Sequence, residues 1–196
     1  MSPAPARTSN QAIVAAARRI LEAEGLDSVT MRAIADAVGV RGPSLYKRVP
    51  DRAALLRLVA DGVIEDMART MSVAVATGDP RRDVAAALHA YRHFVRSNPS
   101  GYRLLFADLP AEALPDAERI AALGGPIVTA MADLLGGEWA LPAARTVVAW
   151  AHGFVTMELA GAFRLGGDLD AAYAFGIEAV LEGVGSATVS GAASPA

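Results

Sequence analysis

Apolar residues recur at helical spacing along most of the chain, and no segment shows the alternation of a half-buried strand. In the stretch 30–55, four apolar side chains at i, i+3, i+4 and i+7 form one stripe between Met31 and Val38. Thr30 precedes this stripe as an N-cap, and Gly39 follows it where a helix commonly ends in a left-handed residue. The pattern predicts a short, capped helix.

A second short helix is predicted directly after a tight glycine turn. Pro43 suits its first position because the amide hydrogen that proline lacks is not needed there. We expect this helix to run from Pro43 to Val49, since Pro50 cannot continue it. Asp51 then caps the following helix. Two short helices joined in this way form the helix-turn-helix layout.

The rest of the chain also predicts helices. A first helix, capped by Ser9 or Thr8, ends at Glu24, and a long helix from Asp51 carries an apolar residue at every fourth position up to Met71. Further helices are expected over 79–97, around 102–106, over 112–135 with a disturbance at 124–126, over 141–165 and over 168–183. The fold class is therefore all-α, with an N-terminal three-helix helix-turn-helix domain, a C-terminal helical bundle and about nine or ten helices.

Breaks between these helices predict the domain organisation. The 196 residues are enough for one or two small domains with buried cores. We expect a helix-turn-helix domain at 8–54, a connecting helix at 55–76, a C-terminal domain at 79–185, and flexible tails at 1–7 and 186–196.

Positive charge gathers on the helix-turn-helix segment. The net charge of the chain is −3, yet residues 41–57 hold five basic side chains and a single acid, Asp51. Residues 1–70 hold ten Arg and Lys against eight Asp and Glu, whereas residues 71–196 hold eight against thirteen. A basic front end on an acidic body favours DNA as the partner of the front end.

The side chains predicted to contact DNA are cations and hydroxyl donors, the groups that bind phosphates. They are Thr30, Arg41, Ser44, Tyr46, Lys47, Arg48 and Arg52. A solvated surface of a small helical bundle would explain the charges alone, but not their coincidence with a helix-turn-helix pattern. We expect the second short helix to meet base edges through Arg41, Ser44 and Lys47 or Arg48.

The same stretch resembles the TetR family of bacterial transcriptional regulators. The resemblance rests on a combination of residues: Thr30, Gly39-Val40, Leu45-Tyr46, Lys47-Arg48, Pro50, Arg52 and Leu55. Val49 departs from it, because that family usually has phenylalanine there, and residues 41–43 replace the usual turn sequence. The resemblance implies a regulator, most often a repressor, that binds a palindromic double-stranded DNA operator as a homodimer.

A second resemblance concerns the C-terminal part. Trp150-Ala151-His152-Gly153, with the stretch 158–168, is similar to a class of TetR-type C-terminal domains named for a Trp-His-Gly (WHG) signature. It implies a dimerisation and effector-binding domain in which two helix pairs form a four-helix interface. The predicted interface residues are Gly153, Ala160, Gly161, Tyr173, Ile177, Val180 and Leu181. The alternative is that both helices are core of a single chain.

The family resemblance also implies a small, largely apolar effector whose binding releases DNA. Its pocket would lie inside the C-terminal helices, lined by aromatic side chains and a few polar groups. The candidate lining residues are Met67, Met71, His93, Tyr102, Phe106, Met131, Trp150, Phe154 and Met157, although each is more often plain core than pocket wall.

Cofactor, metal and enzyme chemistry find little support in the sequence. His89 and His93 are four apart on one helix face, but no third ligand accompanies them, so no metal site is predicted. No phosphate-binding loop or nucleophile elbow is present, and the chain has 0 cysteines. No apolar stretch is a credible membrane span, so we expect a cytoplasmic protein that needs no cofactor and is not an enzyme.

Two alternatives stay open. A regulator of this type could have lost its response to any ligand. Outside this class, a helical small-molecule- or metal-binding protein could use its front domain only as a scaffold.

Overall fold

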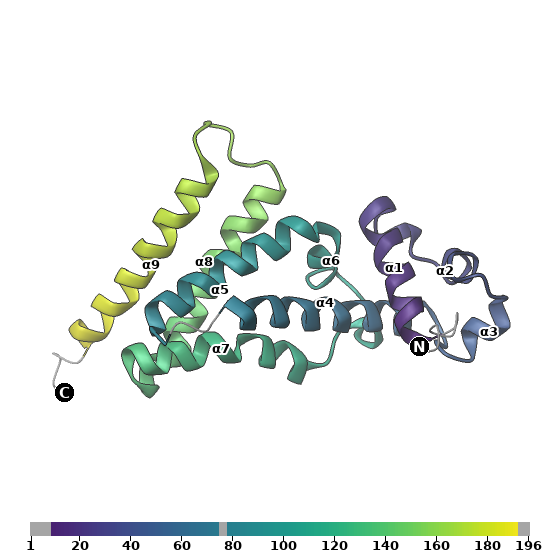
Figure 1. Cartoon of the computed structure of the whole chain (residues 1–196), viewed down its shortest axis with the longest axis horizontal. Coiled ribbons are helices and arrows are strands. Elements are labelled where there is room, and N and C mark those ends of the chain that lie inside the picture. The colour runs from purple at the N-terminus through teal and green to yellow at the C-terminus, as the bar shows by residue number, and fades with distance from the viewer. Residues whose placement is uncertain (1–8, 75–77, 192–196) are drawn as a thin grey trace, which may run out of the picture. The chain divides into compact units, whose positions relative to one another are not determined.

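The computed structural model describes residues 9–74 and 78–191, and within these ranges it holds nine α-helices, two short 3-10 helices and no strand (Figure 1). This confirms the predicted all-α fold. The elements are α1 (Asn10–Glu24), η1 (Leu26–Ser28), α2 (Met31–Val38), α3 (Gly42–Tyr46), α4 (Arg52–Ala74), α5 (Pro80–Ser97), α6 (Pro99–Leu104), η2 (Ala111–Ala113), α7 (Ala117–Leu135), α8 (Gly137–Leu159) and α9 (Leu169–Gly191). None of the described helices has both the length and the apolar character needed to cross a membrane.

The chain folds into two compact units. The N-terminal unit holds residues up to 66 together with 98–120, and the C-terminal unit holds residues 67–97 together with those from 121 on. Helices α4 and α7 each contribute to both units. The helix α6, which lies inside the range predicted for the C-terminal domain, therefore groups with the N-terminal unit.

Side-chain caps begin the helices of the N-terminal unit where the sequence predicts them. The Ser9 hydroxyl accepts from the amide of Ala12 at 3.1 Å, and the Thr30 hydroxyl accepts from the amide three residues on at the same distance. Gly39 ends α2 with φ of 71°, in the left-handed region that favours glycine. The Asp51 carboxylate caps α4 by accepting from the Ala54 amide at 2.8 Å.

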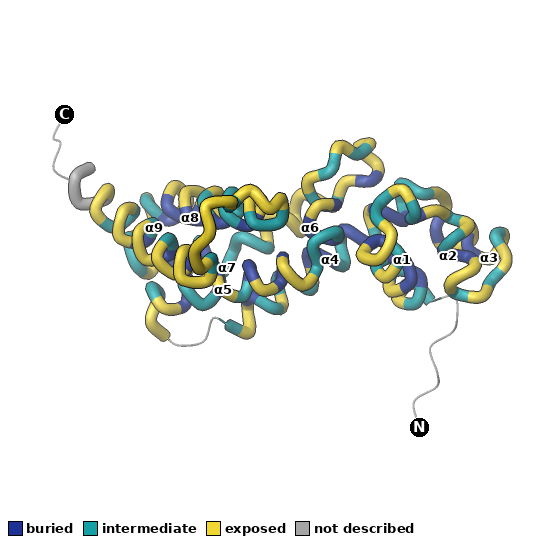
Figure 2. The backbone as a smooth tube through the Cα atoms, turned by 90° about the horizontal axis from the view of Figure 1, so that it is seen from above, coloured by how far each residue is buried: buried dark blue, intermediate teal, exposed yellow. Residues whose placement is uncertain are grey.

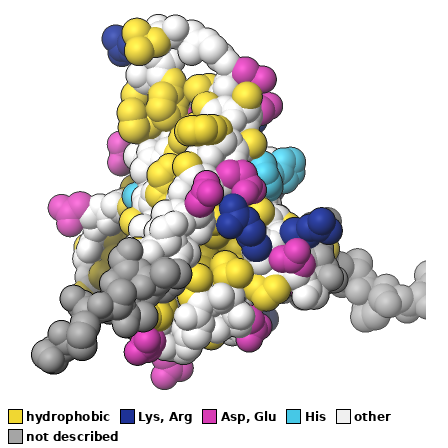
Figure 3. Space-filling model, turned by 90° about the vertical axis from the view of Figure 1, so that its left-hand side faces the viewer, with side chains coloured by type: hydrophobic (Ala, Val, Ile, Leu, Met, Phe, Trp, Pro, Cys, Tyr) yellow, Lys and Arg dark blue, Asp and Glu magenta, His cyan; other side chains and the backbone are white. Residues whose placement is uncertain are grey.

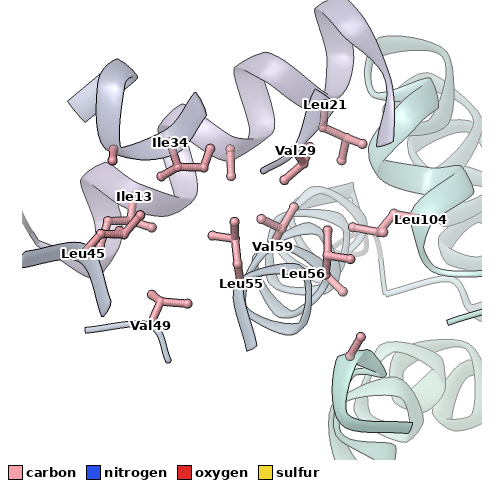
Figure 4. Packing of buried hydrophobic residues seen from close by; sticks show 14 residues of the cluster. Ile13, Leu21, Val29, Ile34, Leu45, Val49, Leu55, Leu56, Val59 and Leu104 are labelled. Atoms are coloured by element: carbon pink, nitrogen blue, oxygen red, sulfur yellow. The ribbon is translucent and has the colours of Figure 1, made fainter. Parts of the chain in front are cut away.

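One apolar cluster holds the N-terminal unit together (Figure 4). Helices α1, α2, α3 and α4 all contribute to it, with α6 and η2 adding one residue each. The buried members are Ile13, Ala17, Leu21, Val29, Ile34, Ala35, Leu45, Val49, Leu55, Leu56, Val59, Ala60, Leu104 and Ala113. Helix–helix packing of this kind supplies the stability that helices of five and eight residues lack alone.

The first turn of α6 is fastened to α1 and α4. The Glu22 carboxylate accepts from the amides of Ser100 at 3.0 Å and Gly101 at 2.7 Å. A β-carbon on Gly101 would lie 3.1 Å from a methyl group of Val63 and 3.2 Å from the Glu22 carboxylate. Glycine at this position therefore permits the close approach of α6 to both neighbours.

In the C-terminal unit, α5, α8 and α9 pack against one another around a cluster of aromatic rings. Tyr173 is fully buried, and its hydroxyl donates to the carbonyl of Leu88 at 2.9 Å. Trp150 stacks on the Tyr173 ring with centroids 5.2 Å apart, and Phe154 meets the same ring at 4.9 Å. The chain between α8 and α9 is mostly exposed (Figure 2).

Several helix ends differ from the predicted ones. Helix α3 ends at Tyr46, three residues early, and the helix expected from 112 begins at Ala117 after a separate 3-10 turn. Helix α8 begins before Pro142 and ends at Leu159, because Gly161 then takes a left-handed φ of 61°. Helix α9 continues to residue 191, so the tail predicted from 186 is helical that far, while 1–7 and 192–196 lie outside the described residues.

Gly176 offers a test of the packing of α9 on α8. A β-carbon there would lie 2.1 Å from the Trp150 ring, so the Gly176→Ala variant must push α9 or the ring aside. We expect its free energy of unfolding to fall by about 1–3 kcal/mol, measured by urea unfolding followed by circular dichroism. Gly124→Ala is the matched control, because that mid-helix glycine of α7 has nothing within 4 Å of the added atom. Equal stability of the two variants would contradict the packing.

Candidate nucleic-acid interface and ligand site

The short helix α3 is anchored by one side chain and presents the others to solvent. Leu45 is fully buried in the apolar cluster of the N-terminal unit. Ser44, Tyr46 and Lys47 surround it in sequence and are exposed, Tyr46 to 53%. A tyrosine so exposed is not core, so its ring and hydroxyl are accessible to a partner of this surface.

Three cations flank α3 without a partner among the described residues. The exposed side chains of Arg41, Lys47 and Arg48 make no ion pair or hydrogen bond within the part of the chain that the structure describes. Elsewhere in the same unit, Arg57 lies 3.8 Å from Asp116. An unpaired, solvated cation keeps all its donors available for phosphate or base contacts.

Thr30 lies at the start of α2 with its side chain exposed. Its oxygen accepts from the amide of Ala33, but its own hydroxyl hydrogen remains available as a donor. The residue therefore suits two tasks, capping α2 and donating a hydrogen bond outward.

Arg52 is placed differently from the prediction. Its Nε donates to the carbonyl of Val29 and its Nη2 to the carbonyl of Leu26, both at 2.8 Å. The guanidinium thus ties the connection between α1 and α2 to the first turn of α4, and these two nitrogens are not available to a phosphate. Sequence analysis missed this role because the two acceptors lie 23 and 26 positions away along the chain.

The predicted pocket residues do not share one environment. Met67, Met71 and Met131 are buried in the C-terminal unit, and Trp150 and Phe154 belong to its aromatic cluster. The rest lie elsewhere: Tyr102 is buried and Phe106 is 62% exposed in the N-terminal unit, whereas Met157 and His93 are exposed in the C-terminal unit.

A polar hollow on the C-terminal unit includes one of these candidates. It measures about 440 Å³ and is lined by His89, Arg92, His93, Arg96 and Ser97, all from α5. On the side of the molecule shown in Figure 3, histidine, basic and acidic side chains lie beside one another, next to hydrophobic ones. The hollow is thus polar, unlike the apolar pocket that the family resemblance implies.

Among the residues that line this hollow, Arg92 is the buried cation. Glu158 accepts from its Nε and Nη2, each at 2.8 Å, and Asp170 lies 2.8 Å from its Nη1. Hydrogen bonds to Glu158, and more weakly to Asp170, raise the pKa of the Arg92 guanidinium above its usual value, although burial opposes the shift. The guanidinium also lies over the ring of Tyr173, 4.9 Å from its centroid.

Three of the predicted interface residues belong to the core of the single chain. Tyr173, Ile177 and Leu181 are at most 1% exposed, packed among helices of their own unit. In the single chain these three side chains are core, which is the alternative that the sequence left open, and their contact with a second copy stays a prediction. Of the others, Gly153 and Val180 are half-buried, and Ala160 and Gly161 lie exposed beyond the end of α8.

The exposed faces of α8 and α9 carry apolar side chains other than the predicted interface residues. They are Leu141, Val148 and Met157 on α8 and Phe175 on α9, with exposed fractions of 47, 39, 47 and 76%. No group of three or more His, Cys, Asp and Glu side chains among the described residues is placed to hold a metal ion.

Comparison with known proteins defines the class. Residues 13–59 match the bacterial regulatory proteins of the tetR family, and residues 84–180 match the tetracyclin repressor-like C-terminal domain. An uncharacterized HTH-type transcriptional regulator of Mycobacterium tuberculosis, Rv0681, is 36% identical over 162 residues, covering 80% of this chain and 73% of that protein. The chain therefore belongs to the TetR family of DNA-binding, helix-turn-helix transcriptional regulators.

Solved structures share its fold. The putative regulatory protein SCO4313 matches with a TM-score of 0.75 at 23% identity, over 88% of this chain and 95% of that one. A substituted form of TetR from Acinetobacter baumannii AYE, in complex with minocycline, matches with a TM-score of 0.67 at 24% identity, over 89% and 95%. The predicted family is confirmed, while the Trp-His-Gly subclass stays a prediction.

Replacing Arg52 separates a structural role from a DNA-contacting one. We expect Arg52→Ala to lower the free energy of unfolding by about 1–3 kcal/mol, because the carbonyls of Leu26 and Val29 lose charged donors. Arg48→Ala, which removes an exposed cation that has no partner in the described part of the chain, should change the free energy of unfolding by no more than about 0.5 kcal/mol. Urea unfolding curves of both variants measure these changes. An unchanged curve for Arg52→Ala would contradict a stabilising role for its hydrogen bonds to the two carbonyls.

Proposed function

We propose that this TetR-family regulator is a repressor that binds a palindromic operator as a homodimer and leaves it when a small effector binds. The single observation that carries the proposal is the set of exposed cations Arg41, Lys47 and Arg48, which flank the anchored helix α3 and have no partners among the described residues. In this proposal the protein acts by binding alone, in the cytoplasm where the chromosome is accessible, and catalyses no reaction.

In the proposed complex, α3 enters the major groove. Arg41, Ser44 and Lys47 approach base edges, because all three are exposed around the buried anchor Leu45. Neighbouring hydroxyl groups donate hydrogen bonds to the phosphates, as does Arg48, and these contacts fix the register of the protein on the DNA. A two-fold operator with half-sites roughly 34–36 Å apart matches two copies of this surface.

The proposed dimer uses the exposed apolar side chains of α8 and α9. Single exposed apolar residues are common on any surface, but Leu141 and Val148 lie seven residues apart on one side of α8, which packs on the helix that carries Phe175, and the TetR-type C-terminal match supports this assignment. Phe175 is the largest of them and is 76% exposed, so it is the expected anchor.

An effector response is supported by two features. A TetR relative of the same fold is solved with minocycline bound, and α4 runs unbroken from Arg52 to Ala74 through both units. An apolar effector that parts the core around Met67, Met71 and Met131 would displace the second half of α4 and, through it, the start of that helix. The change in spacing of two α3 helices would lower affinity for the operator.

DNA binding is tested by fluorescence anisotropy with DNA from upstream of the protein's own gene, at several salt concentrations and against shuffled competitor DNA. We expect tight binding that the shuffled DNA does not displace. Lys47→Gln and Arg48→Gln should each weaken it, and each should reduce the salt slope by about one unit if the cation meets a phosphate. Arg82→Gln is the control, because Arg82 is an exposed cation of the C-terminal unit. Equal affinity for the upstream DNA and the shuffled DNA would contradict the proposal. So would a loss of affinity in Arg82→Gln as large as that in Lys47→Gln and Arg48→Gln.

The dimer is tested by analytical ultracentrifugation of Phe175→Asp. We expect this variant to shift from dimer to monomer while its circular dichroism spectrum stays helical, because a desolvated carboxylate opposes association but not folding of the monomer. Val73→Asp places the same charge at a 79% exposed position of α4 and should leave the dimer intact. A monomeric wild-type protein, or a dimeric Phe175→Asp, would reject this interface.

A further inference from the structure

The polar hollow on α5 is lined entirely by groups that can donate hydrogen bonds. Its five side chains recur at i, i+3, i+4, i+7 and i+8, so they form one face of the helix: His89, Arg92, His93, Arg96 and Ser97. Guanidinium, imidazole and hydroxyl groups all donate, and none of the five is acidic. We propose that this hollow binds a compact oxyanion, the carboxylate or phosphate group of a small molecule.

Arg92 gives the site a guanidinium that is held in one position. Its side chain is only 7% exposed, and Glu158 holds it through two hydrogen bonds of 2.8 Å. The rings of Tyr173 and Phe154 lie beneath the guanidinium, with centroids 4.9 and 5.7 Å away. A cation held this firmly loses little freedom when a ligand arrives, which is the preorganisation that binding sites need.

Arg96 is the movable contact. Its side chain is 54% exposed, and its nitrogens lie 3.3 Å from Asp170 and 3.8 Å from Glu158, both longer than a charge-assisted hydrogen bond. An oxyanion in the hollow would receive shorter, two-pronged hydrogen bonds from this guanidinium than the protein supplies. His93, which is exposed one turn earlier on the same face, adds an N–H donor.

Asp170 is the internal competitor for the same cations. It lies in the first turn of α9, its side chain is 74% exposed, and it contacts both Arg92 and Arg96. Because so exposed a carboxylate is well solvated when released, an incoming oxyanion displaces it at small cost. Two guanidiniums face two carboxylates before the ligand binds, so the site selects by hydrogen-bond geometry and not by excess charge.

This site differs from both surfaces assigned above. It lies wholly within the C-terminal unit, whereas the cations that flank α3 belong to the N-terminal unit, and its polar lining distinguishes it from the packed core around Met131. Binding to it can be measured without DNA. The inference therefore stands or fails independently of the proposed operator binding.

Isothermal titration of the full chain tests the site, with inorganic phosphate and benzoate as probes. Benzamide is the neutral counterpart of benzoate, and sodium chloride keeps the ionic strength constant, so that general screening does not change. We expect saturable binding of at least one of the two anions with one site per chain, and none of benzamide. Both anions failing to saturate, or benzamide binding as well as benzoate, would overturn the proposal.

Three variants locate the binding. Arg96→Gln should weaken anion binding about tenfold or more, because a charged hydrogen-bond donor is lost, and His93→Gln should weaken it less. Arg82→Gln is the matched control, since this arginine is 80% exposed on the same helix and does not line the hollow. Because Arg96 is 54% exposed, we expect Arg96→Gln to leave the buried core unchanged, and urea unfolding curves of the variant and the wild-type protein check this. Unchanged binding in Arg96→Gln, or the same loss in Arg82→Gln, would refute the assignment.

Discussion

The burial of Leu45 is the constraint on which the surface proposed to face DNA depends. A helix of five residues is far too short to persist in water, so α3 is helical only because this side chain is packed against other helices. Val49, just beyond its end, is buried in the same cluster and fixes where the chain leaves. The outward direction of every exposed side chain on α3 follows from these two anchors.

The same logic explains why the N-terminal unit needs more than three helices. Arg52 supplies donors to carbonyls before α2, and Glu22 supplies acceptors to amides that begin α6. The Glu22 contact satisfies amides of the first turn of α6, which have no partner inside that helix, and the Arg52 contact adds charged donors to carbonyls of the connection before α2. A charged side chain from one helix thus completes the end of another, and the unit stays ordered despite its short elements.

Much of this architecture could be predicted from the sequence because its signals are local. Thr30, Gly39 and Asp51 act on amides or on a dihedral angle within three residues, so their roles as caps follow from residue type and spacing. Periodicity was also sufficient to show that one face of α9 is buried. Periodicity could not show what this face packs against, since Tyr173 and Ile177 suit a partner chain and the chain's own core equally well.

The roles that sequence analysis missed depend on contacts between distant positions. Arg92 and Glu158 are 66 residues apart, and nothing near either of them in the sequence marks the pair. The donor-lined hollow is formed by one face of α5, and Asp170 at the start of α9 contacts two of its cations, which a search for aromatic pocket walls does not detect. The helix ends at 46 and 159 likewise depend on packing and on the turn that follows, not on propensity alone.

The single lysine beside α3 also has a consequence for the chemical modification of the protein. Lys47 is the only lysine among the 196 residues, and its side chain is exposed. Amine-directed chemistry on this protein, such as acylation or attachment of a dye, therefore has a single side-chain target along the whole chain. Acylation of this side chain removes a positive charge where the protein is proposed to meet DNA, so modification at this one lysine alters that surface directly.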